Sequence, residues 1–498
     1  MLEINSEQEL PYRRRWYAVI LIIFLFYAWG TLSPKPLYWS DAFKLGDNFK
    51  SYLALNPMQN FTTTYAFRRP EASEVAARLH HDEVGKYLGF RPKEMENFNY
   101  DRRVLPSSRG LESKPNVILV ICESFSMYKS TMGGNPLNTT PYFDSISKQG
   151  IFFDHAFSPH FATARGVFSI LTGTPDVQMA TYSSRVEKSL NQHTIINDFE
   201  GYDKDYFIGG SSEFSNFRGL LENINDLTIH EEGSYTSKPV NVWGISDKDL
   251  FKESIQVLNT KKKPFFSIIQ TADNHRPFTI PVGDVDFVQK QIPDDTLHKY
   301  GFASQDEYQA FCYSDYAFKS FIENARKQPW FENTIFIFTG DHGVAGNAKS
   351  LYADCWTDAR LSDEHIALLF YAPKLLVPAW HKEIVSQIDI LPTLSGLIHM
   401  PYTNSTLGRD VLDPKKTVNG AFTIHHDEGK IGFVSDSFYF VKNIRFPQEQ
   451  LYPLFIGQQM PTQTVQDSLK LKWSKLTTAL YETAKWMLVN NEKKNFDR

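Results

Sequence analysis

NVILVICES, residues 116–124, is the stretch that decides the fold, and two later stretches complete its pattern. FATARGVFSILTG covers 161–173 and TIFIFTGDHG covers 334–343. The first and third begin as apolar, mostly β-branched runs and end in Glu123 and in Asp341–His342, while the second presents Thr163 before an apolar segment. Continuous apolar runs of this length are typical of strands buried on both faces of a parallel sheet.

Similar apolar runs recur along the middle of the chain, with helical stretches such as Tyr142–Gln149 and Glu307–Lys327 between them. The expected strands lie at 116–121, 151–157, 205–210, 264–270, 334–340 and 366–373. This alternation predicts an α/β fold with a mostly parallel central sheet and helices on both faces. Ligands of such sheets bind beyond the carboxyl ends of the strands, so the topology predicts that Glu123, His275 and Asp341–His342 meet there.

The totals exclude some classes of protein. With 498 residues the chain exceeds one ordinary core. Its net charge of −5 argues against nucleic-acid binding. Three cysteines are too few for a disulfide scaffold, although Cys312 and Cys355 could pair outside the cytoplasm, a question that the sequence leaves open.

The N-terminal segment Trp16–Leu32 carries no charged residue and is about long enough for a short or tilted membrane span. Arg13, Arg14 and Arg15 precede it, which places the N-terminus in the cytoplasm and the rest of the chain outside. A cleaved signal peptide is the alternative, but Tyr27 and Trp29 are bulky where small residues are needed. We therefore expect a single uncleaved anchor.

The expected organisation has five parts. They are a cytoplasmic tail (1–15), a transmembrane anchor (16–33), a stalk and packing arm (34–113), a catalytic domain (114–415) and a small C-terminal subdomain (416–498). The last contains a hairpin and an amphipathic helix over Val465–Val489. His80 and His81 in the arm are expected at the surface, and His425 and His426 of the hairpin at the surface or behind the site.

A divalent metal at neutral pH prefers carboxylate and imidazole ligands and, for catalysis, needs a position for substrate. Glu123, Asp341 and His342 supply three ligands, and Thr163 would be the fourth. Coordination would lower the pKa of the Thr163 hydroxyl and make it a nucleophile. The sequence therefore predicts a metal site that contains its own nucleophile.

The chain resembles the alkaline phosphatase/sulfatase superfamily, and within it the lipoteichoic acid synthase and phosphoglycerol transferase branch. The motifs that carry this are NVILVICES, TTPYFDSISKQGIFFDHAFS, TARGVFSILTG, GGSSEFSNFRG, WGISDKDLF, TADNHRPF, FTGDHG and QIDILPTL. Sulfatases place a Cys or Ser within C-x-P-x-R, ten residues before the Gly of a T-G pair, where this chain has Thr163 before Gly173. Since Thr cannot become formylglycine, the resemblance implies phosphoryl transfer.

The resemblance implies a fold like that of alkaline phosphatase and a mechanism. Thr163 would attack a phosphatidylglycerol-like donor and pass phosphoglycerol to an envelope glycan or lipid acceptor. The cofactor would be a divalent ion, with manganese favoured and magnesium or zinc also fitting. The location would be the cytoplasmic membrane of a bacterium, with the catalytic domain outside. The implied substrate-binding residues are His275, which could also shuttle a proton, and Arg218, Asn216, Arg165 and His365.

Two features leave alternatives open. Gly209, Gly210 and Ser211 stand where Gram-positive members of the branch carry His-Gly-Asp, so the donor headgroup is uncertain and phosphoethanolamine transfer and phosphodiester hydrolysis remain alternatives. Trp243 and Asp247 match a family motif and are either functional or structural. From another class, the chain could be an inactive envelope protein that binds glycan.

Overall fold

The computed structural model describes residues 13–29, 72–105, 111, 114–415 and 418–493. The chain divides into two units, Met1–Arg69 and Pro70–Arg498. In the first, helix α1 covers Arg13–Trp29. Within the described ranges we find no helix with both the length and the apolar content that a membrane crossing requires. The predicted anchor (16–33) extends beyond the end of α1 into residues outside the described ranges. Most of the predicted stalk (34–113) also lies outside these ranges.

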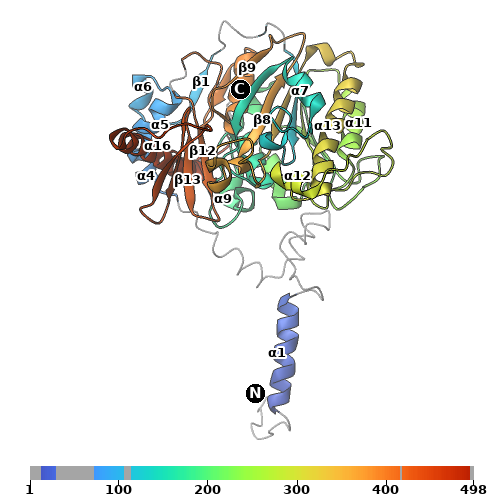
Figure 1. The fold of residues 1–498 in the computed structure, drawn as a ribbon, viewed down its shortest axis with the longest axis horizontal. Helices are drawn as coiled ribbons and strands as arrows, with labels where there is room; N and C mark the ends of the chain where they lie inside the picture. The colour runs from blue at the N-terminus through green and yellow to red at the C-terminus, as the bar shows by residue number, and fades with distance from the viewer. Residues whose placement is uncertain (1–12, 30–71, 106–110, 112–113, 416–417, 494–498) are drawn as a thin grey trace, which may run out of the picture. The chain divides into compact units, whose positions relative to one another are not determined.

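The second unit is built on a nine-stranded sheet with the order β10-β3-β8-β7-β2-β6-β4-β5, in which β9 also pairs with β3 (Figure 1). Its strands are β2 Asn116–Cys122, β3 Ile151–Phe157, β4 Asp203–Ile208, β5 Leu227–His230, β6 Phe265–Gln270, β7 Thr334–Gly340, β8 His365–Tyr371, β9 Ala379–His381 and β10 Val385–Ser386. Every pairing is parallel except the two that β8 makes. The predicted mostly parallel sheet is confirmed.

Helices cover both faces of this sheet, and β2 shows why. Val117, Leu119 and Ile121 pack into one apolar cluster, while Ile118 and Val120 pack into another on the opposite face. The first cluster includes α8 Thr163–Thr172, α10 Phe217–Leu221 and α15 Ile390–Leu397. The second includes α7 Pro141–Ser147, α11 Asp247–Leu258 and α13 Gln305–Ala325, which lie together in Figure 1. Because successive side chains of a strand point to opposite faces of the sheet, each apolar run contributes side chains to two hydrophobic clusters.

The C-terminal part is larger than the predicted hairpin. It is a four-stranded antiparallel sheet of β12 Ala421–His425, β13 Lys430–Val434, β14 Phe438–Asn443 and β15 Glu449–Pro453. Helix α16, Gln463–Asn490, packs on it and also on the arm helices α4 Glu74–Leu79 and α5 His81–Leu88. His81 is buried among the rings of Phe90, Phe98 and Tyr100, so its predicted surface position is wrong.

Shorter elements connect these layers. β1 Arg102–Val104 pairs with β11 Tyr402–Asn404, and short α-helices are α6 Pro92–Met95, α9 Glu187–Leu190, α12 Asp294–Lys299 and α14 Cys355–Asp358. Short 3-10 helices are η2 Met127–Lys129, η3 Ser183–Arg185, η4 Ile195–Asp198, η5 Phe214–Asn216, η6 Phe331–Asn333, η7 Leu361–Asp363 and η8 Gln387–Asp389. Cys312 and Cys355 are both free thiols and lie in different apolar clusters.

Candidate functional site

Three of the predicted ligands meet at the carboxyl edge of the sheet. β2 and β7 are neighbours in parallel register, with Cys122 opposite Gly340. Glu123 and Asp341 are the next residues of the two strands, and His342 follows. One ligand atom from each of the three lies within 4.8 Å of the others. The register of two central strands therefore builds this half of the site.

Thr163 reaches the same point from α8, where it is the first helical residue. Its Oγ1 lies 3.4 Å from Glu123 Oε2 and 3.3 Å from His342 Nε2. The close approach depends on Gly166, because a Cβ atom there would stand 2.1 Å from the carbonyl oxygen of Asp341. The spacing Thr-Ala-Arg-Gly thus places the hydroxyl over the site and leaves no side chain where the helix crosses the strand end.

The electrostatics of these groups fit a bound cation. Glu123 and Asp341 are buried, and burial together with the neighbouring Asp341 carboxylate raises the pKa of Glu123 well above its usual range. Asp341 Oδ1 accepts hydrogen bonds from two main-chain N–H groups, those of Ser124 at 2.7 Å and His342 at 2.8 Å. Within the described residues Asp341 Oδ2 has no hydrogen-bond partner. Two adjacent buried carboxylates with an unpaired oxygen are costly without a positive partner.

The orientation of His342 agrees with a ligand role. Its Nδ1 lies 2.5 Å from the carbonyl oxygen of Gly343, so Nδ1 carries the proton and donates it there. The Nε2 lone pair then faces Thr163 and the carboxylates. A metal-binding imidazole is commonly fixed in this way by a hydrogen bond at its other nitrogen. Glu123, Asp341 and His342 could therefore hold a divalent metal ion.

Two residues that we did not predict hold the strand ends. Asn274 Nδ2 donates to the carbonyl oxygens of Glu123 and Ser124, at 3.0 and 3.2 Å. Gln387 Nε2 donates to those of Gly340 and Asp341, at 2.7 and 2.9 Å. Both lie in motifs quoted above, TADNHRPF and QIDILPTL, so the motifs marked the segments although not the roles of these amides.

The structure gives Arg165 a different role from the predicted contact with phosphate. Its side chain is buried, and its guanidinium donates to the carbonyl oxygens of Asp176, Gln178 and Thr181 at 3.1, 2.6 and 3.0 Å. It also lies 3.3 Å from a carboxylate oxygen of Asp176. The arginine fastens the segment 176–181 to the helix that carries Thr163.

His365 also differs from its prediction. It begins β8 at the expected edge of the sheet, but its ring packs against Phe157 and Trp356, with centroids 5.1 and 4.8 Å away. Its Nε2 lies 2.8 Å from the carbonyl oxygen of Asp154. Burial lowers the pKa of His365 to about 3. It is a neutral core histidine and has no contact with the predicted ligands.

The loop before Thr163 is tied to the C-terminal sheet. Ile424 N donates to the carbonyl oxygen of Pro159 at 2.8 Å, and His426 Nδ1 lies 2.8 Å from His160 Nε2. His425 is buried, with its Nε2 2.9 Å from Glu364 Oε1. His425 therefore lies behind the site, as we expected in one alternative, whereas His426 is partly exposed.

The remaining predicted substrate-binding residues, His275, Arg218 and Asn216, follow β6 and β4, which are parallel neighbours. His275 is partly exposed, with its ring 4.4 Å from that of Trp243, and Trp243 Nε1 donates to the carbonyl oxygen of Arg276 at 2.7 Å. Arg218 is paired with Glu213 at 2.7 Å and with Glu231. Asn216 has a φ of +58° and donates to the carbonyl oxygen of Ser184 at 2.6 Å.

The departure at Gly209 and Gly210 has a steric basis. A Cβ atom at either position would stand 2.8 Å from a carbonyl oxygen, that of Ile245 or of Trp243 respectively. Asp247, in the same family motif as Trp243, is buried and accepts hydrogen bonds from the N–H groups of Ala272 and Asp273, at 2.7 and 3.2 Å. Asp247 is therefore structural, while Trp243 lies against His275.

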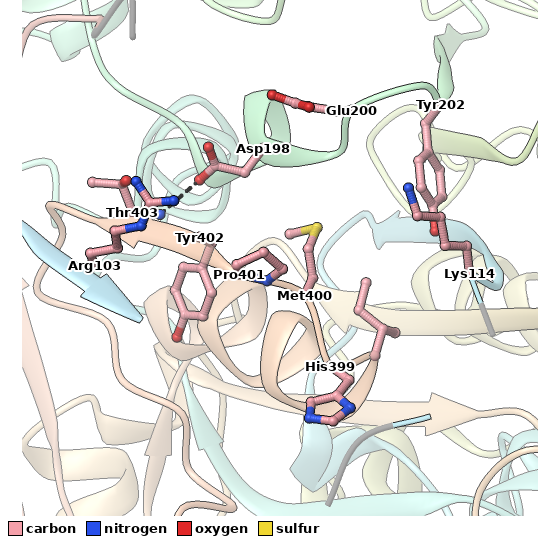
Figure 2. A pocket seen from close by; sticks show the side chains of 11 residues that line it. Arg103, Lys114, Asp198, Glu200, Tyr202, His399, Met400, Pro401, Tyr402 and Thr403 are labelled. Atoms are coloured by element: carbon pink, nitrogen blue, oxygen red, sulfur yellow. Dashed lines mark hydrogen bonds between the residues drawn. The ribbon is translucent and has the colours of Figure 1, made fainter. Parts of the chain in front are cut away.

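A cavity of about 390 Å³ lies at the other edge of the sheet (Figure 2). Lys114 and Tyr202, which line it, precede β2 and β4 and so mark the amino ends of parallel strands. Asp198 accepts the hydrogen bond of Thr403 N at 2.9 Å across it. Its lining contains none of the predicted ligands, so this cavity and the candidate site are separate places.

The comparisons agree with this geometry. The sulfatase family model matches residues 115–400. Lipoteichoic acid synthases of Staphylococcus aureus strains USA300 and NCTC 8325 are 23% identical to the chain over 354 residues, which cover 68% of this chain and 52% of theirs. The chain thus spans about half the length of the curated relatives it matches.

Two solved structures share the fold. One is an alkaline phosphatase superfamily protein from Vibrio parahaemolyticus, with a TM-score of 0.63, 22% identity and coverage of 83% of this chain and 97% of that one. The other is the lipoteichoic acid synthase LtaP from Listeria monocytogenes, with a TM-score of 0.65, 17% identity and coverage of 83% and 98%. The fold is thus the mixed α/β fold of alkaline phosphatase. Since the family model matches more than half of the 498 residues, the chain belongs to the sulfatase family.

Proposed function

We propose that this protein is a metal-dependent phosphotransferase that moves phosphoglycerol from a phospholipid donor, through Thr163, to an envelope glycan or lipid acceptor. The observation that carries the proposal is the Thr163 hydroxyl at a helix N-terminus, within 3.4 Å of Glu123 and 3.3 Å of His342. The similarity to lipoteichoic acid synthases supports a transferase of this kind. An inactive glycan-binding protein would have no need of this arrangement.

Thr163 is the proposed nucleophile in both steps of the reaction. Its oxygen bonds to the donor phosphorus, the bond from phosphorus to the diacylglycerol oxygen breaks, and that oxygen takes up a proton. An acceptor hydroxyl then attacks the phosphoglyceryl group and gives up its proton, the bond between Thr163 and phosphorus breaks, and the Thr163 oxygen regains the proton that it lost in the first step. The N-terminus of α8, where Thr163 lies, would favour the negative charge of the phosphoryl oxygens. We propose that His275 moves the proton of the leaving group.

A divalent cation at Glu123, Asp341, His342 and Thr163 would supply Lewis-acid chemistry, acidifying the hydroxyl and balancing phosphoryl charge. We propose manganese, and the carboxylate and imidazole donors also suit magnesium or zinc. Threonine at 163 favours phosphoryl over sulfuryl chemistry because it cannot be converted to formylglycine.

The proposed location is the cytoplasmic membrane of a bacterium. Three arginines precede the uncharged segment that begins at Trp16, and this asymmetry supports a single anchor with Thr163 on the outer side. The donor then lies in the same membrane as the anchor. The acceptor is an envelope glycan or lipid.

The decisive experiment is mass spectrometry of the Thr163 peptide after the full chain has been incubated with manganese and bacterial membrane lipids. We expect added phosphoglycerol, together with release of diacylglycerol. Thr163→Ala should lose both, and Thr163→Ser should regain part of each. An added phosphoethanolamine mass would identify the alternative donor. An unmodified peptide and no release of diacylglycerol would refute the proposed transferase.

A further inference from the structure

A cluster of three charged side chains, Glu213, Arg218 and Glu231, lies beyond the carboxyl end of β4. The cluster is linked to His275 through two aromatic rings. Phe214 follows Glu213 in the chain and lies 5.1 Å from the ring of Trp243, which in turn lies 4.4 Å from that of His275. The cluster therefore belongs to the same edge of the sheet as Thr163.

Hydrogen bonds fix the three side chains. Arg218 Nε donates to Glu213 Oε1 at 2.7 Å, and Arg218 Nη2 donates to Glu231 Oε1. The second oxygen of Glu231 accepts a hydrogen bond from Ser212 N at 2.8 Å. Two of the five N–H groups of the guanidinium are thus committed to carboxylates, and these two carboxylates offset the positive charge that we predicted would face phosphate.

One acceptor in the cluster has no partner. The Glu213 side chain is 9% exposed. Its Oε2 is buried and forms no hydrogen bond with any described residue. Two carboxylates against one guanidinium leave an excess of one negative charge. A buried carboxylate oxygen without a donor is costly, and a ligand that brings an N–H or O–H group would remove that cost.

We propose that Glu213, held by Arg218 and Glu231, accepts a hydrogen bond from the donating end of the lipid headgroup, namely the terminal hydroxyls of phosphoglycerol. This inference rests on the proposed function and adds the interaction by which the protein would select its lipid donor. The ammonium group of phosphoethanolamine offers the same chemistry, whereas a headgroup that ends in a second phosphate is repelled by the excess negative charge.

The test compares donors that share the phosphodiester and differ at the headgroup terminus. Release of diacylglycerol by the full chain is measured with phosphatidylglycerol, phosphatidylethanolamine and phosphatidylethanol, the last of which has no hydroxyl. We expect wild type to prefer phosphatidylglycerol over phosphatidylethanol in kcat/KM. Glu213→Gln should reduce that preference about 10- to 100-fold, the worth of one hydrogen bond to a charged acceptor, so turnover of phosphatidylglycerol should fall much more than that of phosphatidylethanol.

Glu232→Gln is the matched control, because Glu232 is exposed beside the cluster and loses the same charge. An unchanged preference in Glu213→Gln, or an equal loss with both lipids, would overturn the inference. A preference of wild type for phosphatidylethanolamine that Glu213→Gln abolishes would retain the subsite and assign it to an ammonium group.

A binding measurement separates this inference from the proposed transferase. Calorimetry of the manganese-loaded chain with glycerol 1-phosphate and with methyl phosphate needs no turnover. The subsite is supported if wild type binds glycerol 1-phosphate more tightly than methyl phosphate and Glu213→Gln removes this difference, even if wild type transfers nothing. Equal binding of the two phosphates by wild type would overturn it even if transfer occurs.

Discussion

The contact between α8 and the end of β7 makes a quantitative prediction for Gly166→Ala. The new methyl carbon would stand 2.1 Å from the carbonyl oxygen of Asp341 and 2.9 Å from its carbonyl carbon. An ordinary van der Waals contact needs about 1 Å more. The two atoms that the methyl group would meet belong to the main chain of Asp341, at the end of a buried strand, so the helix must move. Overpacking of this kind costs about 1–3 kcal/mol of unfolding free energy.

The larger effect is expected on activity, because Thr163 lies one helical turn before Gly166. A displacement of about 1 Å between a nucleophile and its partners can lower the rate about 100-fold. We expect kcat for diacylglycerol release to fall by about that factor, while thermal unfolding shows a folded protein. Manganese affinity, measured by calorimetry, should fall less, because Glu123, Asp341 and His342 do not lie on α8.

Gly283→Ala is the control, because a Cβ atom there would meet nothing within 4 Å. It should leave both activity and stability near those of wild type. If Gly166→Ala kept wild-type kcat, or lost activity only by unfolding, the steric account of how Thr163 is placed would be refuted.

Three further predictions follow from the described contacts. Asp341→Asn should abolish manganese binding in calorimetry yet raise the unfolding temperature of metal-free protein, since it removes one of two adjacent buried carboxylates; a lower unfolding temperature would contradict this. Arg165→Lys should lower the unfolding free energy by about 2–4 kcal/mol and reduce kcat with little change in KM for the lipid; a rise in KM alone would restore the predicted phosphate contact. His365 titrates near pH 6.5 when unfolded and near 3 when folded, so its contribution is complete above pH 6.5 and declines as pH falls toward 3, by about 2 kcal/mol at pH 5. Urea unfolding of His365→Gln should show a shallower acid loss than wild type.

The sequence predicted what the main chain determines. The two apolar runs that end in acidic residues predicted β2 and β7, and the parallel register of these strands brings Glu123 and Asp341 together. It could not predict where long side chains turn. Arg165 and His365 occupy the expected positions in the chain, yet one turns to the carbonyl groups of 176–181 and the other into an aromatic cluster. These outcomes depend on packing partners distant in sequence, as does the antiparallel direction of β8.

The extent of the C-terminal part was underestimated for a related reason. Alternation over His425–Asn443 indicated a hairpin. The fourth strand, β15, has one buried residue, and the others are exposed or partly exposed, so it gives little periodic signal. The junction of α16 with α5 was also not visible, because both helices are amphipathic and the sequence does not pair their faces. Long-range contacts between such helices are set by the shape of the assembled core.

The bonds from Ile424 and His426 to the loop 158–160 have a consequence for the order of events during synthesis. Residue 163 leaves the ribosome more than 250 residues before its loop can meet β12. Until then the loop that precedes Thr163 lacks two of its anchors. A chain that ended before β12 would thus carry every proposed ligand and lack these two bonds to the loop that leads into α8.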